Sequence, residues 1–356
     1  MSLARRLIGL AAVGSLLISP ALVPPSASAE PLEPATAPKT HTVGVGSNPY
    51  AVAIAQNLGK AFVVLDGGIS VVSLLTHREL AEFNTFGFHD QSGIALVRNN
   101  TKGYITNGAI TTVAVFDTET YKVRPSIRVG YGAIAIATAN TPKGERAYLI
   151  TSADAGPGPG KAKNELIGIQ TSTGKVVSRT RLPERALGAL AVQPGGKRIW
   201  VGGFSQGRIY QVSTTNGKVV KTLNATKAGP ITGFAFAPKG KVWLTGRAGV
   251  SVINAASGKS VAFLTAPKVF PSGFIYPKGV VLNNSGSHAV VANSVENDSS
   301  NKTWGALAAI NTKTYKVSWR VKTGSWPQGM ALDRTRSTLY VTNYDDDTVT
   351  YLPIKR

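Results

Sequence analysis

The sequence contains no cysteine, and acidic residues are scarce: 18 Asp and Glu stand against 39 Lys and Arg. Without thiols the chain can form no disulfide, no cysteine nucleophile and no cysteine-ligated metal site. A chain without disulfides must draw its stability from a packed core, and a hydrophobic content of 43% supports one. The formal net charge of +21 favours anionic partners or surfaces.

Long apolar runs are also missing, except near the N-terminus. There, Arg5-Arg6 precedes an apolar run from Leu7 to Leu22, and Ala27-Ser28-Ala29 provides an A-x-A cleavage site. The run is short and interrupted by proline, which argues against a membrane span. We therefore expect residues 1–29 to be a signal peptide cleaved near Ala29, with an uncleaved anchor as the alternative.

The mature chain is expected to be secreted or to reside in the cell envelope, periplasmic or extracellular, without a transmembrane segment. Residues 30–40 are rich in Pro, Ala and Thr, a composition that predicts a disordered tether. Residues 41–356 form the remaining domain, and they carry a repeat.

The repeat consists of short apolar strands at the spacing of four-stranded propeller blades. Seven units each begin with a strand rich in small residues, and their anchors are 42, 40, 56, 44, 46 and 50 residues apart. Further β-rich runs follow in each unit, separated by turn phrases such as Asn216-Gly217. The second and third strands carry the aromatic residues expected to fill the space between blades. The anchors are Ala53, Ala95, Ala135, Ala191, Ala235, Val281 and Ala331.

The last unit has only three strands before the sequence ends at Arg356. The missing outer strand is found at the other end, because residues 41–46 match the phrase Ile127-Arg128-Val129-Gly130 that ends the second unit. We expect this N-terminal strand to complete the last blade and close the ring, which removes exposed sheet edges.

The middle strand of the last unit reads Tyr340-Val341-Thr342-Asn343. With the phrase around it, this strand resembles the exported YVTN-type β-propeller repeat family (YVTN/lactonase-like seven-bladed propellers). The resemblance covers residues 41 to 356 and implies an all-β, seven-bladed β-propeller with four antiparallel strands per blade. It says little about activity, since this fold hosts many functions.

In a propeller, the loops entering the first strand and those joining the second and third strands share one face, the top face. On this face, aromatic residues with interspersed basic groups suit a ring-shaped or carbonyl-bearing ligand, although they could equally plug the channel by packing. The candidate ligand-binding residues are Tyr50, Phe88, His89, Tyr131, Arg185, Lys227, Tyr276, Lys278, Trp304 and Trp326.

The other turns lie on the bottom face and are rich in cations. They could contact an anionic polymer, a lipid surface or nucleic acid, or they could be ordinary turn residues that keep the chain soluble. The first-to-second-strand turns contain Lys60, Lys102, Lys143, Arg146, Lys197, Arg198, Lys239, Lys241, Arg334 and Arg336. The third-to-fourth-strand turns contain Lys122, Lys175, Lys218, Lys259, Lys313 and Lys316.

The sequence offers few residues for a catalytic or metal site. A lactonase or lyase needs convergent carboxylates, amides or a histidine at the channel mouth, and the entrance loops offer Glu184 and the pair His89-Asp90. The run from Asp345 to Asp347 could bind Ca²⁺, but a solvated hairpin tip is the preferred interpretation. No zinc spacing, phosphate loop or dinucleotide motif is present.

The sequence thus predicts an exported, non-enzymatic β-propeller binding or scaffold protein of the bacterial cell envelope, with a ligand or protein bound on the top face. The alternatives are a cationic propeller that binds nucleic acid or an anionic polymer, and a metal-assisted lyase or lactonase. We expect a monomer with no cofactor, no metal and no catalytic residue assigned.

Overall fold

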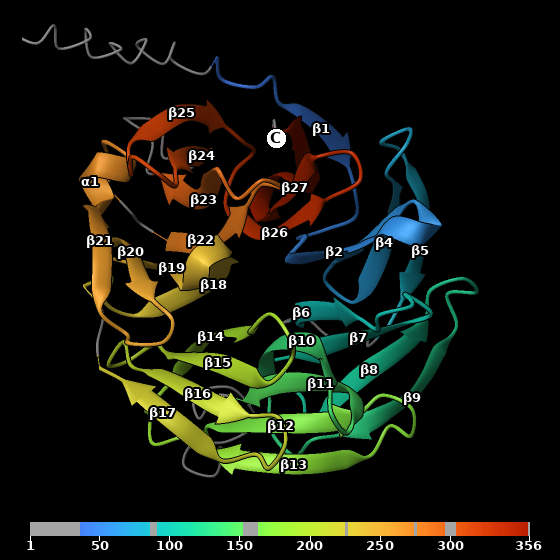
Figure 1. The fold of residues 1–356 in the computed structure, drawn as a ribbon. Coiled ribbons are helices and arrows are strands. Elements are labelled where there is room, and N and C mark those ends of the chain that lie inside the picture. The colour runs from blue at the N-terminus through green and yellow to red at the C-terminus, as the bar shows by residue number, and fades with distance from the viewer. Residues whose placement is uncertain are drawn as a thin grey trace, which may run out of the picture. The chain divides into compact units, whose positions relative to one another are not determined.

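The computed structural model describes residues 36–85, 91–151, 163–224, 227–273, 276–295 and 304–354, with only the backbone described at residues 91, 92, 276 and 295. These ranges belong to one compact unit, Ala35–Arg356. They form seven four-stranded antiparallel sheets arranged in a ring (Figure 1). The predicted seven-bladed β-propeller is therefore confirmed.

The blades follow the sequence, and in blades 1–6 the strands run from the axis outwards in chain order. Blade 1 contains β2 (Ala51–Ala55), β3 (Lys60–Val64), β4 (Gly68–Ser73) and β5 (Glu79–Asn84). Blade 2 contains β6 (Gln91–Leu96), β7 (Lys102–Asn107), β8 (Thr112–Asp117) and β9 (Val123–Arg128). Blade 3 contains β10 (Ala133–Thr141), β11 (Gly144–Thr151), β12 (Glu165–Gln170) and β13 (Val176–Arg181). Blade 4 contains β14 (Leu187–Val192), β15 (Arg198–Gly203), β16 (Ile209–Ser213) and β17 (Val219–Leu223).

The remaining blades follow the same plan. Blade 5 contains β18 (Ile231–Ala237), β19 (Lys241–Gly246), β20 (Gly249–Asn254) and β21 (Ser260–Thr265). Blade 6 contains β22 (Tyr276–Leu282), β23 (His288–Val295), β24 (Trp304–Asn311) and β25 (Val317–Lys322). Blade 7 contains β26 (Pro327–Asp333), β27 (Thr338–Asn343), β28 (Thr348–Pro353) and, outermost, β1 (His41–Gly44). The short helical turns are η1 (Gln56–Leu58), η2 (Pro238–Gly240), α1 (Ala266–Val269) and η3 (Tyr344–Asp346).

The inner strands are thin because neighbouring blades meet at the axis. A Cβ atom on Gly233 of β18 would lie 2.6 Å from the Cα atom of Gly279 in β22. A Cβ atom on Gly329 of β26 would lie 2.7 Å from the Cα atom of Ala51 in β2. At both positions a larger residue would force the strands apart, which explains why these strands are rich in Gly and Ala.

Large aromatic side chains fill the wider space between blades farther from the axis. Trp200 of β15 is fully buried and contacts Phe234 and Phe236 of the next blade, with ring centroids 6.2 and 5.5 Å away. Trp243 of β19 is also fully buried and lies 5.9 Å from the ring of Tyr315. Such buried rings contribute much of the core's stability because each removes a large apolar area from water.

The ring closes as the sequence predicts. β1 pairs antiparallel with β28 from His41↔Tyr351 to Gly44↔Thr348. Beyond β1, the Val45 amide donates to the Asp347 carbonyl at 2.9 Å, and both Val43 and Val45 pack on the core between blades 7 and 1.

A cluster of rings lies beside this closure. His77, in the turn after β4, stacks on Tyr351 of β28 with ring centroids 4.0 Å apart, and its Nδ1 lies 3.0 Å from the Tyr340 hydroxyl. His41 also stacks on Tyr351, at 5.4 Å. Burial, followed by the nearby His41 and Arg336, lowers the pKa of His77 below its ordinary value of 6.5, while Asp333 partly opposes the shift.

The closure predicts a clear effect of truncation. A chain beginning at Ser47 lacks β1 and should have an unfolding free energy lower by roughly 2–4 kcal/mol than a chain beginning at His41, because it loses the ladder to β28 and the packing of two valines. Chemical denaturation of the two truncated chains measures the difference. Equal stability would show that β1 does not close the ring.

The His77 environment predicts acid sensitivity. The folded-state pKa of His77 lies below its unfolded value, so the unfolded chain takes up the proton first as the pH falls. His77 therefore lowers the unfolding free energy below about pH 6.5 and has no such effect above it. Urea unfolding at about pH 7.5 and 5 should show a smaller acid loss in His77→Asn than in the wild type, since Asn tolerates the positive φ of 52° at this position. An undiminished acid loss in the variant would contradict this assignment.

A second histidine is expected to contribute to the loss of unfolding free energy at low pH. Burial also lowers the pKa of His288, so the parallel variant His288→Asn is needed to separate the two contributions.

Candidate functional site

A cavity of about 630 Å³ lies on the ring axis, within the size range of small-ligand sites. Within the described ranges, six of the seven blades contribute to its lining. The lining residues are Tyr50, Ala51, Ile134, Ala186, Leu187, Gly188, Phe204, Thr232, Arg247, Pro277, Lys278, Gln328 and Gly329. Several of them lie in entrance loops or in second-to-third-strand loops, so the cavity opens towards the top face.

A repeated backbone irregularity places side chains in this cavity. Near its top end, the inner strand of each of blades 2–7 shifts register against the second strand, as a β-bulge does, whereas β2 of blade 1 pairs evenly. A bulge redirects the extra residue out of the alternating pattern. The bulged residues whose side chains the structure describes all line the cavity: Ile134, Gly188, Thr232, Lys278, and Gln328 with Gly329.

The electrostatics of the cavity favour anions. Lys278 and Arg247 are the charged residues among those that line it in the described part of the chain. Lys278 is half-buried, and desolvation lowers the pKa of its amine to about 8. The amine is therefore mainly protonated at neutral pH and becomes neutral in mildly alkaline solution.

Polar and apolar groups share the remaining wall. Tyr50, Thr232 and Gln328 provide hydrogen-bonding groups, whereas Ile134, Leu187 and Phe204 provide apolar surface. The cavity can thus hold a small molecule with an anionic group and an apolar or ring-shaped body.

Tyr50 is held in place by the loops of blade 7. Its ring packs edge-on against Tyr344 of η3, with centroids 4.7 Å apart. The acids that follow Tyr344 then tie this turn to two entrance loops: Asp346 Oδ2 accepts the Ser325 amide at 2.6 Å, and Asp347 Oδ1 accepts the Asn48 amide at 2.8 Å. The tip at Asp345–Asp347 is exposed to solvent, as the preferred interpretation expects, and its carboxylates also fasten the loops around Tyr50.

Glu184 holds a loop of the top face in place. It is buried, and its carboxylate accepts hydrogen bonds from the Ser205 hydroxyl, from the Gln206 amide at 2.7 Å and from the Tyr210 hydroxyl at 3.1 Å. These contacts hold the loop after β15, and with it Phe204, against the entrance loop of blade 4. Glu184 was considered as a catalytic acid from the sequence, but in the structure its carboxylate is engaged in positioning a loop.

Of the ten predicted ligand-binding residues, the structure brings Tyr50 and Lys278 to the cavity. Arg185 and Lys227 are exposed, and Tyr131 and Trp326 are half-buried; none of the four lines the cavity. Trp304 lies beneath Lys322, whose Nζ is 4.5 Å from the ring centroid. Phe88 and His89 lie outside the described residues, as does the side chain of Tyr276.

The sequence interpretation missed Arg247, Thr232 and Gln328. Arg247 occupies the two-residue turn between β19 and β20, a turn type that the face assignment already placed at the top, so the signal was available. Thr232 and Gln328 lie at bulges, and an alternating pattern cannot reveal which residue of a strand is bulged.

Among the described residues, no group of three or more His, Asp or Glu side chains could hold a metal ion. His89-Asp90 lies outside these residues. Glu165, the acid that begins β12, is buried and pairs with Arg179 at 2.9 Å.

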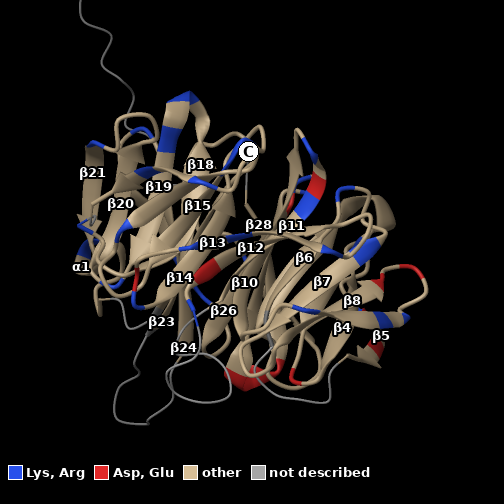
Figure 2. Cartoon of the chain, turned by 90° about the horizontal axis from the view of Figure 1, so that it is seen from below, with Lys and Arg blue, Asp and Glu red and all other residues tan. Residues whose placement is uncertain are grey.

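The bottom face keeps most of its predicted cations at the surface. Figure 2 shows Lys and Arg spread over the rim that carries the C-terminus. Four of the predicted cations are less available: Lys60, Lys102 and Lys241 are half-buried, and Arg146 is buried against Gln170 and Thr214. Lys241 donates to the Tyr315 hydroxyl at 2.8 Å.

The described residues contain no helix that is long and apolar enough to cross a membrane. No protein-family model matches the chain, and no curated protein sequence is similar to it. Among solved structures, the chain is similar to hydrazine synthase from Kuenenia stuttgartiensis, with a TM-score of 0.72 and 16% sequence identity over 86% of this chain and 96% of that chain. At this identity the similarity shows the propeller fold alone.

Proposed function

We propose that this propeller binds a small anionic ligand in its axial cavity, with Lys278 and Arg247 holding the anionic group. The observation that carries the proposal is the presence of these two cations, Lys278 half-buried and Arg247 exposed, in the lining of one cavity of about 630 Å³ at the top of the axis. Arg247 offers a planar fork of donors for a carboxylate or phosphate, whereas Lys278 acts as a point charge.

The cavity is preorganised for this role. Lys278 is presented by a bulge in β22 and Arg247 by a short turn between paired strands, so both are carried by the rigid sheet and not by long loops. A rigid site loses little conformational entropy on binding. The apolar wall formed by Leu187, Ile134 and Phe204 then suits the body of a ring-shaped or carbonyl-bearing ligand.

The family resemblance and the cellular location of the chain belong to the same proposal. The repeat at Tyr340–Asn343 resembles exported YVTN-type propellers, and residues 1–29 have the composition of a signal peptide. We propose a binding or scaffold protein of the cell envelope, cleaved near Ala29.

The proposal predicts a dependence on Lys278 and on pH. In titrations with phosphate, citrate and benzoate as probes, the ligand that binds wild type should bind Lys278→Met and Arg247→Met at least about tenfold more weakly, because each substitution removes a charge-assisted hydrogen bond. Affinity should also fall between about pH 7 and 9 in the wild type as the Lys278 amine, with a pKa of about 8, loses its proton. That alkaline step should vanish in Lys278→Met.

The matched control is Lys163→Met, which removes an exposed top-face charge that does not line the cavity. Isothermal titration calorimetry of the four proteins provides the comparison. Equal losses of affinity in all three variants would show that only the net charge matters and would contradict the proposed site.

A further inference from the structure

The turns between the third and fourth strands of blades 1–6 share one backbone design. Each has a residue with positive φ that lets the chain reverse into the outer strand, and a cation follows it directly. The six pairs are His77-Arg78, Tyr121-Lys122, Gly174-Lys175, Gly217-Lys218, Gly258-Lys259 and Tyr315-Lys316. All six cations are exposed.

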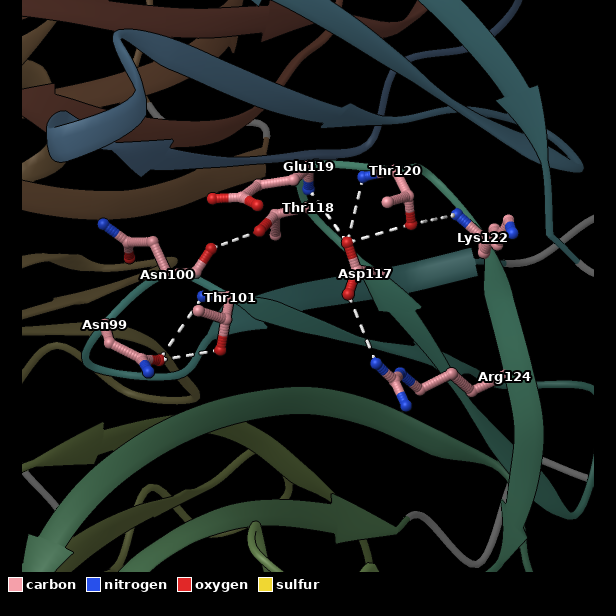
Figure 3. A network of polar contacts seen from close by, with 9 residues as sticks. All are labelled: Asn99, Asn100, Thr101, Asp117, Thr118, Glu119, Thr120, Lys122 and Arg124. Carbon is pink, nitrogen blue, oxygen red and sulfur yellow. Dashed lines mark hydrogen bonds and ion pairs between the residues drawn. The ribbon is translucent and has the colours of Figure 1, made fainter.

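Figure 3 shows this turn in blade 2. The Asp117 carboxylate accepts the Glu119 and Thr120 amides at 3.1 and 2.9 Å and pairs with Arg124 at 3.2 Å. Lys122 emerges from the far side of the turn. These contacts, together with a backbone bond from Tyr121 to Asp117, require no positive charge at residue 122.

The conformation of a Gly-Lys turn therefore does not explain why a cation is present. In three of the six turns the left-handed residue is His or Tyr and not Gly, although a non-Gly residue with positive φ is uncommon. The cation is present all the same. Local turn chemistry accounts for the glycines, but not for the charge.

A second regularity lies two residues farther along the chain. In blades 1, 3, 4 and 5 the outer strand has a β-bulge just after the turn, and the bulged residue is aliphatic: Leu80, Val177, Val220 and Val261. Their side chains are 53%, 44%, 48% and 44% exposed. Single exposed apolar residues are ordinary, but here the same bulge exposes one two residues after an exposed Arg or Lys in four blades.

We propose that the third-to-fourth-strand turns of blades 3–5 and the bulges after them, the lower rim of these blades, dock on an anionic lipid surface. In this arrangement the headgroups are contacted by Lys175, Lys218 and Lys259. The side chains that insert between the headgroups are those of Val177, Val220 and Val261. Lysines near a charged bilayer and apolar side chains at its boundary contribute independently to such binding. Nucleic acid is the less suitable partner. Single strands are bound by exposed aromatic rings, whereas the exposed large apolar residues on this described arc are aliphatic.

The test is co-sedimentation with vesicles of phosphatidylcholine alone and with about 30% phosphatidylglycerol, at about 0.05 M salt. The chain from Glu30 is used, because it lacks the apolar run at residues 7–22 while keeping the closed ring. We expect binding to the anionic vesicles only, and its loss at about 0.5 M salt.

Two variants and a control separate charge from insertion. Lys175→Glu/Lys218→Glu/Lys259→Glu should weaken binding at least about tenfold. The variant Val177→Ser/Val220→Ser/Val261→Ser, with unchanged charge, should weaken it at least about threefold. The control Arg128→Glu/Lys163→Glu/Arg181→Glu makes the same charge change at exposed positions near the top face and should stay within about twofold of wild type.

Several results would overturn the proposal: no binding to anionic vesicles, equal losses in the control and the lysine variant, or an unaffected serine variant. Stronger binding to a duplex DNA than to vesicles would assign the rim to nucleic acid instead. The proposal is independent of the axial cavity, since the rim variants should leave small-anion binding unchanged; either proposal can fail while the other stands.

Discussion

The pairing of β1 with β28 is the constraint on which the rest of the structure depends. It joins the two ends of the described chain in one sheet, so that seven wedge-shaped blades form a closed ring and the edge of β28 is covered by β1. Closure also places the described loops on one of two faces. Residues far apart in the sequence, such as Tyr50 and Lys278, then meet at one cavity.

Bulges give this regular ring its chemistry. At the axis, register shifts near the tops of the inner strands direct Lys278 and Thr232 into the cavity. At the lower rim, register shifts in the outer strands expose Val177 and Val220 next to lysines. In both places one extra residue breaks the alternation that buries a strand's apolar side chains, and it does so at the same position in several blades.

Much of the fold could be predicted from the sequence because its signals are periodic. Small residues around Ala53 and its equivalents mark the inner strands, and the match between residues 41–46 and the end of blade 2 reveals the closing strand. The site was harder to predict. Trp326 and Arg185 have the side chains expected of a ligand site, yet they do not line the cavity, because the position of a loop residue depends on contacts such as that between Asp346 and Ser325.

Glu184 illustrates the same difficulty. By residue type and position, an acid in an entrance loop is a candidate catalytic group. Only its buried hydrogen bonds show that Glu184 holds the loop containing Phe204. Arg247 was predictable in principle, since a two-residue turn between β19 and β20 must lie on the top face.

The most direct test of the central claim, that the closed ring concentrates two cations in an anion-binding cavity, is anomalous diffraction from crystals soaked in selenate. The strongest selenium peak is expected in the axial cavity beside Lys278 and Arg247. An empty cavity in crystals whose bottom-face lysines bind selenate would contradict the claim.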